Sequence, residues 1–216
     1  IALARAHPDR IRCSLGLHPY YADRFDPGFI ARLKRALAAA PEAVAIGEIG
    51  LDYAKAAIAP EVQRQAFAAL LEAGRDLAVP LVIHCRDAYA DLILMLRERF
   101  PSPPQDRRFW GVVHCFSGMP EEALACTALG FALGADGPVT YKKNDSLREA
   151  FRRAGPGITV LETDCPYLPP QSSRGKRNEP RSIVEIAAKL AEVWNIPVSE
   201  VARLTSVNAA ALYQWP

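Results

Sequence analysis

Short apolar runs alternate along the chain with longer stretches in which apolar residues recur every three or four positions. Runs such as residues 81–83 are apolar at consecutive positions, which is typical of strands buried on both faces of a parallel sheet. The recurring positions between the runs predict helices. The runs themselves predict strands over residues 11–17, 43–49, 80–84, 111–115, 131–134 and 158–162.

Local start and stop signals place helices between these strands. Asp26 followed by Pro27 predicts a helix start, because an N-cap carboxylate and a proline in the first turn both favour one. Asp87 is predicted to cap the helix that follows it, and Gly130 to end the helix before it. Helices are predicted over residues 1–6, 88–99, 119–129, 147–151 and 183–193 and downstream of residue 60.

The alternation of strand and helix predicts an α/β fold with a parallel sheet, either open and doubly wound or closed into a barrel. The length of 216 residues suits a single domain over 1–216. A closed barrel of this type needs about eight strands, and six are predicted. The chain also begins with Ile1 inside a helical pattern, so we expect part of the sequence upstream of it to be missing.

Composition narrows the class of protein further. The chain is 50% hydrophobic and 23% charged, which excludes a disordered chain, and its net charge of +2 disfavours a protein that coats nucleic acid in bulk. Its apolar stretches are too short to cross a membrane. Five cysteines without close spacing indicate reduced thiols, as in a cytoplasmic protein. We also expect no membrane partner and a monomer.

Metal-binding types of side chain stand at the carboxyl ends of the predicted strands. Glu48, His84 and His114 each end a strand, while His18 and Asp164 closely follow one. Active sites of parallel α/β folds are built at this rim, so we expect these groups to converge there. Imidazoles and carboxylates together suit Zn, Mn or Mg. Each group alone could instead satisfy a backbone group or cap a helix, but several at one rim favour a metal site.

Two cysteines and a basic loop lie close to these residues in the sequence. Cys85 and Cys115 each follow a histidine along a strand, so we expect them to point to the opposite face and pack against helices rather than bind zinc. The basic loop after Asp164 is either solvated or, at the same rim, a clamp for phosphate. It contains Arg174, Lys176, Arg177 and Asn178.

Six blocks carry the polar residues in a fixed order and span nearly the whole chain. They are 16–19 (GLHP), 47–53 (GEIGLDY), 82–87 (VIHCRD), 113–118 (VHCFSG), 161–168 (LETDCPYL) and 174–180 (RGKRNEP). Together they resemble the TatD-type metal-dependent deoxyribonucleases, which belong to the amidohydrolase-like TIM barrels. The resemblance implies a TIM-barrel-type repeat of parallel strands and helices, with six of the eight strands present.

The same resemblance implies a role for each polar side chain. Glu48 would bridge two divalent metal ions, and His84 and His114 would bind one of them. Asp164 would bind a metal and handle the proton of the attacking water. Substrate phosphate would be faced by His18, Arg86, Arg174, Lys176, Arg177 and Asn178. Family members open with a strand that ends in His-x-His, which is absent here, so one of the two metal sites would lack ligands in this chain.

We therefore expect a metal-dependent hydrolase domain that cleaves phosphodiester bonds of DNA, with single-stranded DNA as its partner. Two Mg, Mn or Zn ions would lower the pKa of a shared water and stabilise charge on the reacting oxygens. Two alternatives stay open. The same rim could hydrolyse another ester or amide, as a D-aminoacyl-tRNA deacylase does, or the chain could be an inactive, truncated metal-binding protein.

Overall fold

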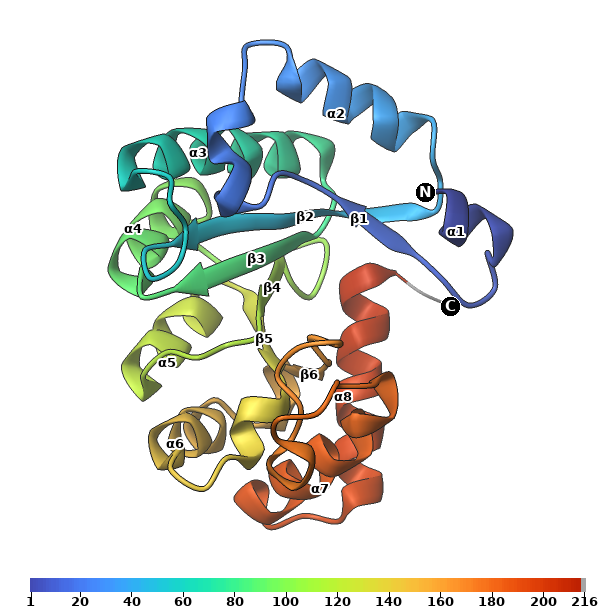
Figure 1. The fold of residues 1–216 in the computed structure, drawn as a ribbon, viewed down its shortest axis with the longest axis vertical. Helices are drawn as coiled ribbons and strands as arrows, with labels where there is room; N and C mark the ends of the chain where they lie inside the picture. The colour runs from blue at the N-terminus through green and yellow to red at the C-terminus, as the bar shows by residue number, and fades with distance from the viewer. Residues whose placement is uncertain (215–216) are drawn as a thin grey trace. The chain divides into compact units, whose positions relative to one another are not determined.

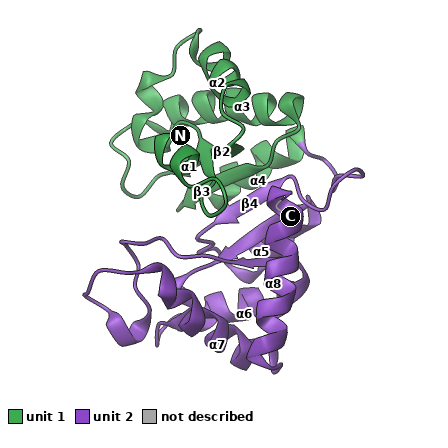
Figure 2. Ribbon diagram, turned by 90° about the vertical axis from the view of Figure 1, so that its right-hand side faces the viewer, with its two compact units in different colours: residues 1–99 green, residues 100–216 purple. Residues whose placement is uncertain are grey.

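The computed structural model describes residues 1–214 and confirms the predicted α/β class. Strands and helices alternate along the chain (Figure 1), and the strand pairs β1–β2, β2–β3, β4–β5 and β5–β6 are all parallel. The chain divides into two compact units, residues 1–99 and 100–216 (Figure 2). That residues 1–216 form one domain stays a prediction.

The first unit is built on three parallel strands in the order β1–β2–β3. Gly50 on β2 pairs with His84 on β3, and Asp52 pairs with Arg86, so the second half of β2 runs beside the polar half of β3. The elements are α1 (Ala2–Ala6), β1 (Cys13–Leu15), the 3-10 helix η1 (Pro19–Arg24), α2 (Phe29–Ala38), β2 (Ala43–Asp52), α3 (Pro60–Leu77), β3 (Leu81–Arg86) and α4 (Tyr89–Arg99).

Apolar side chains of β2 and α3 form much of the core of this unit. Ile46 and Ile49 on the strand and Leu71 on the helix have no exposed surface. The helix can lie close to the sheet because Gly74 has no side chain: a Cβ there would come within 2.3 Å of Leu81 Cδ2. Close packing of this kind resists small shifts, so α3 and β2 hold the strand ends in fixed positions.

A buried glutamine of α3 fixes the carboxyl end of β2. Gln63 is 1% exposed, and its Oε1 accepts a hydrogen bond from the backbone N–H of Asp52 at 2.8 Å. Its Nε2 donates to the carbonyls of Asp52 at 3.0 Å and Ile58 at 2.7 Å. A buried amide whose hydrogen bonds are made favours one arrangement of its neighbours. The backbone of Asp52 is therefore held from the helix as well as from the sheet.

The second unit is also built on three parallel strands, in the order β4–β5–β6. β5 is buried along its whole length, as a run of consecutive apolar residues predicts. The elements are β4 (Gly111–His114), α5 (Pro120–Ala128), β5 (Phe131–Ala135), η2 (Gly137–Thr140), α6 (Asp145–Ala154), η3 (Pro156–Ile158), β6 (Thr159–Leu161), η4 (Gln171–Ser173), η5 (Pro180–Ser182), α7 (Ile183–Trp194) and α8 (Val198–Tyr213). None of the helices within residues 1–214 has the length and hydropathy needed to span a membrane.

All six predicted strands are present, but their ends and burial differ from the prediction. β2 continues to Asp52, so Glu48 lies inside the strand and not at its end. β3 also continues past His84, and it alternates between buried and part-exposed residues instead of being buried on both faces. The part-exposed face carries His84 and Arg86. This face of β3 is therefore not covered by apolar packing at the positions of its polar side chains.

Two predicted helix starts are displaced in the structure. α2 begins at Phe29, two residues later than Asp26 and Pro27 predict, and the Asp26 side chain accepts a hydrogen bond from the backbone N–H of Gly28 at 2.7 Å in the turn that precedes the helix. Asp87 has a left-handed backbone conformation, with φ at 52°. An N-cap residue is extended, and α4 begins two residues later at Tyr89, so Asp87 lies outside the cap position.

Helix α8 is missing from the prediction, because it buries polar residues where a helical pattern has apolar ones. Thr205 and Asn208 are 2% and 1% exposed and lie on the face toward the core. Asn208 Nδ2 donates to the carbonyls of Pro156 at 2.8 Å and Thr159 at 2.7 Å, which joins the helix to the start of β6. The apolar periodicity of α8 is therefore weak.

Candidate active site

The first unit brings Glu48 of β2 and His84 of β3 into contact. Glu48 Oε1 lies 2.9 Å from His84 Nδ1, and the two side chains are 33% and 19% exposed. On the other side of the ring, His84 Nε2 donates to Asp52 Oδ2 at 3.1 Å. The imidazole therefore lies between two carboxylates of the same strand.

Asp52 favours a proton on Nε2 of His84. Its side chain has no exposed surface, and its Oδ1 accepts from the backbone N–H of Ala54 at 3.0 Å and of Lys55 at 2.7 Å. Burial alone would raise the pKa of Asp52, but the hydrogen bonds from Lys55 and His84 hold it below its ordinary value. The ionised carboxylate then requires a proton on His84 Nε2. In the neutral ring, the lone pair of Nδ1 points toward Glu48, as a metal ligand needs.

His18 joins this cluster from the segment between β1 and η1. Its Nε2 lies 3.7 Å from Glu48 Oε1, and its ring centroid lies 4.8 Å from that of His84. Ligand atoms of His18, Glu48 and His84 all lie within 4.8 Å of one another. However, His18 Nδ1 accepts a hydrogen bond from the backbone N–H of Tyr20 at 3.2 Å, so the neutral ring carries its proton on Nε2. Such a ring is a hydrogen-bond donor toward the cluster and is less suited to bind a cation there.

Arg86 and Tyr20 form the polar boundary of the same cluster. Burial raises the pKa of the Tyr20 hydroxyl, and its contact with Asp52 raises it further. Arg86 also hydrogen-bonds to this hydroxyl and partly offsets the shift. Arg86, predicted to face phosphate, is therefore a cation beside the imidazole–carboxylate cluster and is part-exposed at the end of β3.

The second unit contains a similar arrangement around His114. Its Nδ1 donates to Glu162 Oε1 at 3.0 Å, and the same oxygen accepts from the backbone N–H of Cys115. His114 Nε2 faces Asp164 Oδ1 at 3.7 Å. The sequence makes room for Glu162 through Gly134, where a Cβ would lie 2.2 Å from Glu162 Oε1. Here the proton is held on Nδ1, so Nε2 is the nitrogen suited to bind a cation.

Asp136, which follows β5, binds the backbone of Asp164. Its Oδ2 accepts from the backbone N–H of Asp164 at 3.1 Å, and burial raises its pKa to about 6. The thiol of Cys115 hydrogen-bonds to Asp136, and burial raises the pKa of that thiol well above its ordinary value. The expectation that Cys115 points to the face opposite His114 is therefore wrong. The Cys115 φ of 45° interrupts the alternation of the strand and turns the side chain toward the carboxylates.

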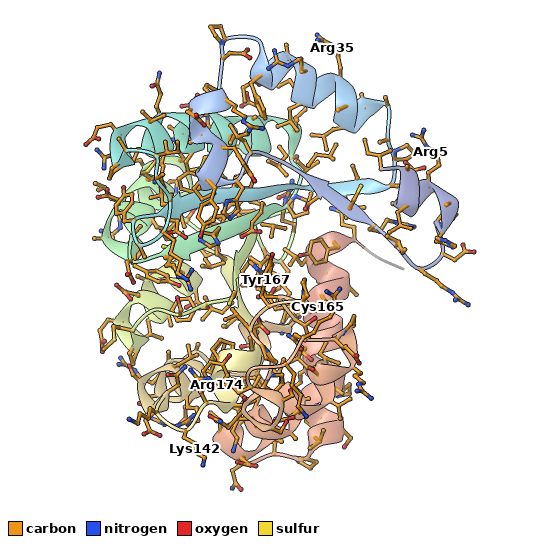
Figure 3. All side chains as sticks on the ribbon, in the orientation of Figure 1. Arg5, Arg35, Lys142, Cys165, Tyr167 and Arg174 are labelled. Carbon is orange, nitrogen blue, oxygen red and sulfur yellow. The ribbon has the colours of Figure 1, made fainter. Side chains whose placement is uncertain are left out.

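The basic loop lies in the second unit, on the segment after β6 that also carries Cys165 and Tyr167 (Figure 3). Arg174 stacks its guanidinium over the ring of Tyr141, 4.5 Å from the centroid. Lys176 and Arg177 are exposed. Asn178 is 2% exposed and donates to the carbonyl of Tyr167 at 2.7 Å, so its side chain holds the loop together. A contact between Asn178 and substrate would have to compete with this bond.

Three carboxylates of these clusters were not among the predicted site residues. Asp52 stands four positions after Glu48, Glu162 stands two positions before Asp164, and Asp136 follows β5. Each lies inside or directly after a strand, the same signal that identified the histidines. Sequence alone does not show that a carboxylate orients a neighbouring imidazole, because this depends on the register between strands.

The donor set fits a divalent cation. In the first unit Glu48 and His84 could hold it through a carboxylate oxygen and Nδ1, and in the second unit His114 and Asp164 could do so through Nε2 and a carboxylate oxygen. Nitrogen and oxygen donors of this kind suit Zn or Mn, and each ring is oriented by a second carboxylate, as in metal-binding histidines generally. That all four side chains share one site stays a prediction.

Comparisons with known proteins identify the family of the chain. The family model described as "TatD related DNase" matches residues 1–214. An uncharacterized metal-dependent hydrolase, YabD of Bacillus subtilis, is 34% identical over 206 residues, which cover 95% of this chain and 78% of that protein. The 3'-5' ssDNA/RNA exonuclease TatD of Erwinia billingiae is 36% identical over 220 residues, covering 100% and 82%.

A solved structure extends the comparison to the fold. The crystal structure of YJJV, a TatD homologue from Escherichia coli K12, matches with a TM-score of 0.89 at 28% identity and covers 99% of this chain and 81% of that one. The TIM-barrel-type repeat expected from the sequence is therefore confirmed, and the six-block resemblance with it. The chain belongs to the TatD family of metal-dependent hydrolases.

Proposed function

We propose that this protein is a metal-dependent nuclease that hydrolyses phosphodiester bonds of single-stranded DNA. The observation that carries the proposal is the pair of oriented imidazoles, His84 and His114. One nitrogen of each ring contacts a buried or part-buried carboxylate, and the other nitrogen faces a second carboxylate. Such pairs suit cation binding far better than structural support, for which one hydrogen bond would be enough. A related protein is named as an exonuclease on single-stranded DNA and RNA, which supports a nucleic-acid substrate.

The side chains of this chain have separable tasks in such a reaction. Glu48 and His84 would hold one cation, and His114 and Asp164 would hold a second. A bound divalent cation lowers the pKa of water and stabilises negative charge on phosphate oxygens. Asp164 would accept the proton of the attacking water, since its backbone is fixed by Asp136 and its carboxylate is part-exposed.

Positive and hydrogen-bonding groups would bind the phosphate. His18 would donate from Nε2, the nitrogen that carries the proton while Nδ1 accepts from Tyr20. Arg86 in the first unit and Arg174, Lys176 and Arg177 in the second would attract the backbone of the nucleic acid. We further propose that the protein acts as a cytoplasmic monomer, and that its ions are Mg, Mn or Zn.

A substrate panel tests this proposal. The protein is freed of metal with a chelator, supplied with Mg²⁺, Mn²⁺ or Zn²⁺ in turn, and assayed on single-stranded DNA, duplex DNA, RNA and a D-aminoacyl-tRNA. We expect metal-dependent cleavage of single-stranded DNA. Faster release of the amino acid from tRNA than cleavage of DNA would show that the protein is a deacylase. No activity with any metal would show that it is an inactive metal-binding protein.

Glu48→Gln provides the matched test of the site. The substitution removes the charge that would hold the cation, so we expect activity on DNA to fall by roughly 100-fold or more. Glu98→Gln, on the exposed surface of α4 beside Arg99, makes the same chemical change away from the site and should leave activity unchanged. Full nuclease activity of the Glu48 variant would refute the assignment.

A further inference from the structure

We propose that the ring of Tyr167 is a stacking platform for an unpaired nucleobase beside the reacting phosphate, and that it makes the protein selective for single strands. Tyr167 is 68% exposed and is the most exposed tyrosine within residues 1–214. The inference rests on the proposed function, and it adds the group that recognises a base to the groups that act on phosphate.

The backbone that carries this ring is rigidly held. Tyr167 N–H donates to the carbonyl of Asp164 at 2.7 Å, which closes a turn directly after the candidate ligand. The buried Asn178 donates from Nδ2 to the carbonyl of Tyr167 at 2.7 Å, and from its backbone N–H to the carbonyl of Pro166 at 3.0 Å. With its backbone groups satisfied, the segment needs no burial of the ring for its own stability. A large apolar ring held in water on a fixed turn is suited to a ligand.

The turn places the backbone of Tyr167 close to Asp164, which belongs to the imidazole–carboxylate pair of the second unit. Asp164 begins the turn, and its carboxylate faces His114 Nε2 at 3.7 Å. A base that stacks on Tyr167 would therefore belong to a nucleotide adjacent to the phosphate handled by Asp164. Figure 3 shows Tyr167 and Cys165 on this segment.

Positive charge on the same loop fits the backbone of a nucleic acid. Arg174 is held over the ring of Tyr141, and the hydroxyl of Tyr141 donates to the carbonyl of Pro169 at 3.0 Å. The loop is also tied to η2, since Gln171 N–H donates to Thr140 Oγ1 at 2.8 Å. An exposed aromatic ring and positive side chains on one loop are the combination that binds single strands, with stacking for the bases and charge for the phosphates.

Stacking on such a ring requires a free face of the base. A base inside a duplex has both faces covered by its neighbours, so a double strand would have to open before it could bind. Loss of one base–aromatic stack generally weakens binding by roughly 5- to 150-fold. The ring therefore contributes both affinity and discrimination against duplexes.

The test uses Tyr167→Ala and Tyr167→Phe in the full chain with two substrates. One is a single-stranded oligodeoxynucleotide, and the other is the same strand with abasic residues. We expect Tyr167→Ala to raise KM for the normal strand by roughly tenfold while changing kcat and the KM for the abasic strand little. Tyr167→Phe keeps the ring and should behave as the wild type. Val184→Ala removes a side chain that is 67% exposed in the same unit and serves as the control.

Equal effects of Tyr167→Ala on normal and abasic strands, or an unchanged KM for both, would overturn the inference. Cleavage of the abasic strand by the wild type reports the proposed function separately, so the two ideas can fail independently. Fluorescence anisotropy of the labelled strands, recorded in chelator, gives Kd without any cleavage. A Kd difference between wild type and Tyr167→Ala that is confined to the normal strand supports stacking, and the absence of such a difference contradicts it.

Discussion

Two imidazoles are oriented by carboxylates in different ways, and the difference has consequences for single residues. Asp52 uses one oxygen for the backbone N–H groups of Ala54 and Lys55 and the other for His84. Glu162 uses a single oxygen for both His114 and the backbone N–H of Cys115. An amide can replace a carboxylate only where its oxygen alone is needed, because its nitrogen donates.

Asp52→Asn should therefore weaken metal binding. The amide oxygen would stay with the backbone N–H groups, so its nitrogen would face His84 Nε2 and donate to it. The ring proton would then move to Nδ1, the nitrogen that faces Glu48, and a protonated nitrogen cannot bind a cation. We expect the Kd for Mn²⁺ to rise by roughly 10- to 100-fold, measured by isothermal titration calorimetry. Asp91→Asn, whose carboxylate binds Tyr53 and Arg64 away from this ring, is the control.

Glu162→Gln should have a much smaller effect. The amide oxygen can accept both hydrogen bonds that Glu162 Oε1 now accepts, so the proton stays on His114 Nδ1. We expect the Kd for Mn²⁺ to change by less than about fivefold in the same titration. A loss as large as that of Asp52→Asn would show that charge, and not the position of the ring proton, governs these sites.

Cys126 on α5 gives a pH prediction that is independent of the site. Its side chain has no exposed surface, and burial raises the pKa of its thiol to about 12. Because the unfolded thiol ionises near pH ~8.5, the native state binds more protons than the unfolded state above that pH. This group's contribution to stability is complete below pH ~8.5 and is lost as pH rises toward 12. Alkylation followed by mass spectrometry at pH ~9 should leave Cys126 unmodified in the folded protein. Rapid modification there would contradict its burial.

At the scale of elements, polar side chains in the interior position the helices. Asn208 of α8 binds two carbonyls next to β6, and Gln63 of α3 binds two near the end of β2. These hydrogen bonds fix the position of each helix against its sheet. Apolar packing alone would define that position less closely.

Asn208→Ala tests how much a buried polar side chain of this kind contributes to the stability of the protein. The change leaves the carbonyls of Pro156 and Thr159 without the amide donor, so we expect the free energy of unfolding to fall by about 1–3 kcal/mol. Ser206→Ala, on the exposed face of the same helix, should change it by less than about 0.5 kcal/mol. Urea unfolding followed by circular dichroism measures both, and equal stabilities of the two variants would contradict the account.

The sequence was sufficient for elements with a strong apolar pattern. All six strands were predicted, because strands such as β5 are apolar at every position. Helix α8 was not, because Thr205 and Asn208 occupy positions facing the core. The start of α2 was misplaced because the Asp26 side chain forms a turn with Gly28, a local choice between turn and cap that the residue types do not decide.

At the scale of the whole molecule, the candidate site follows from the order of blocks along a repeated strand–helix pattern. Glu48, His84, His114 and Asp164 were identified because each was predicted to lie at or close to the end of a strand, and the structure places them in two imidazole–carboxylate contacts. Asp52 and Glu162 were missed, since their tasks depend on strand register and on the space left by Gly134. The family match over residues 1–214 agrees with the predicted chemistry.

The central claim is that these side chains bind the divalent cations on which hydrolysis depends. Anomalous X-ray diffraction from crystals of the protein grown with Mn²⁺ tests it directly, because the signal locates the metal without assumptions about its ligands. We predict Mn²⁺ bound by Glu48 and by Nδ1 of His84, with further metal beside Nε2 of His114 and Asp164. Mn²⁺ bound elsewhere, with none at either histidine in a protein that cleaves DNA in its presence, would contradict the account.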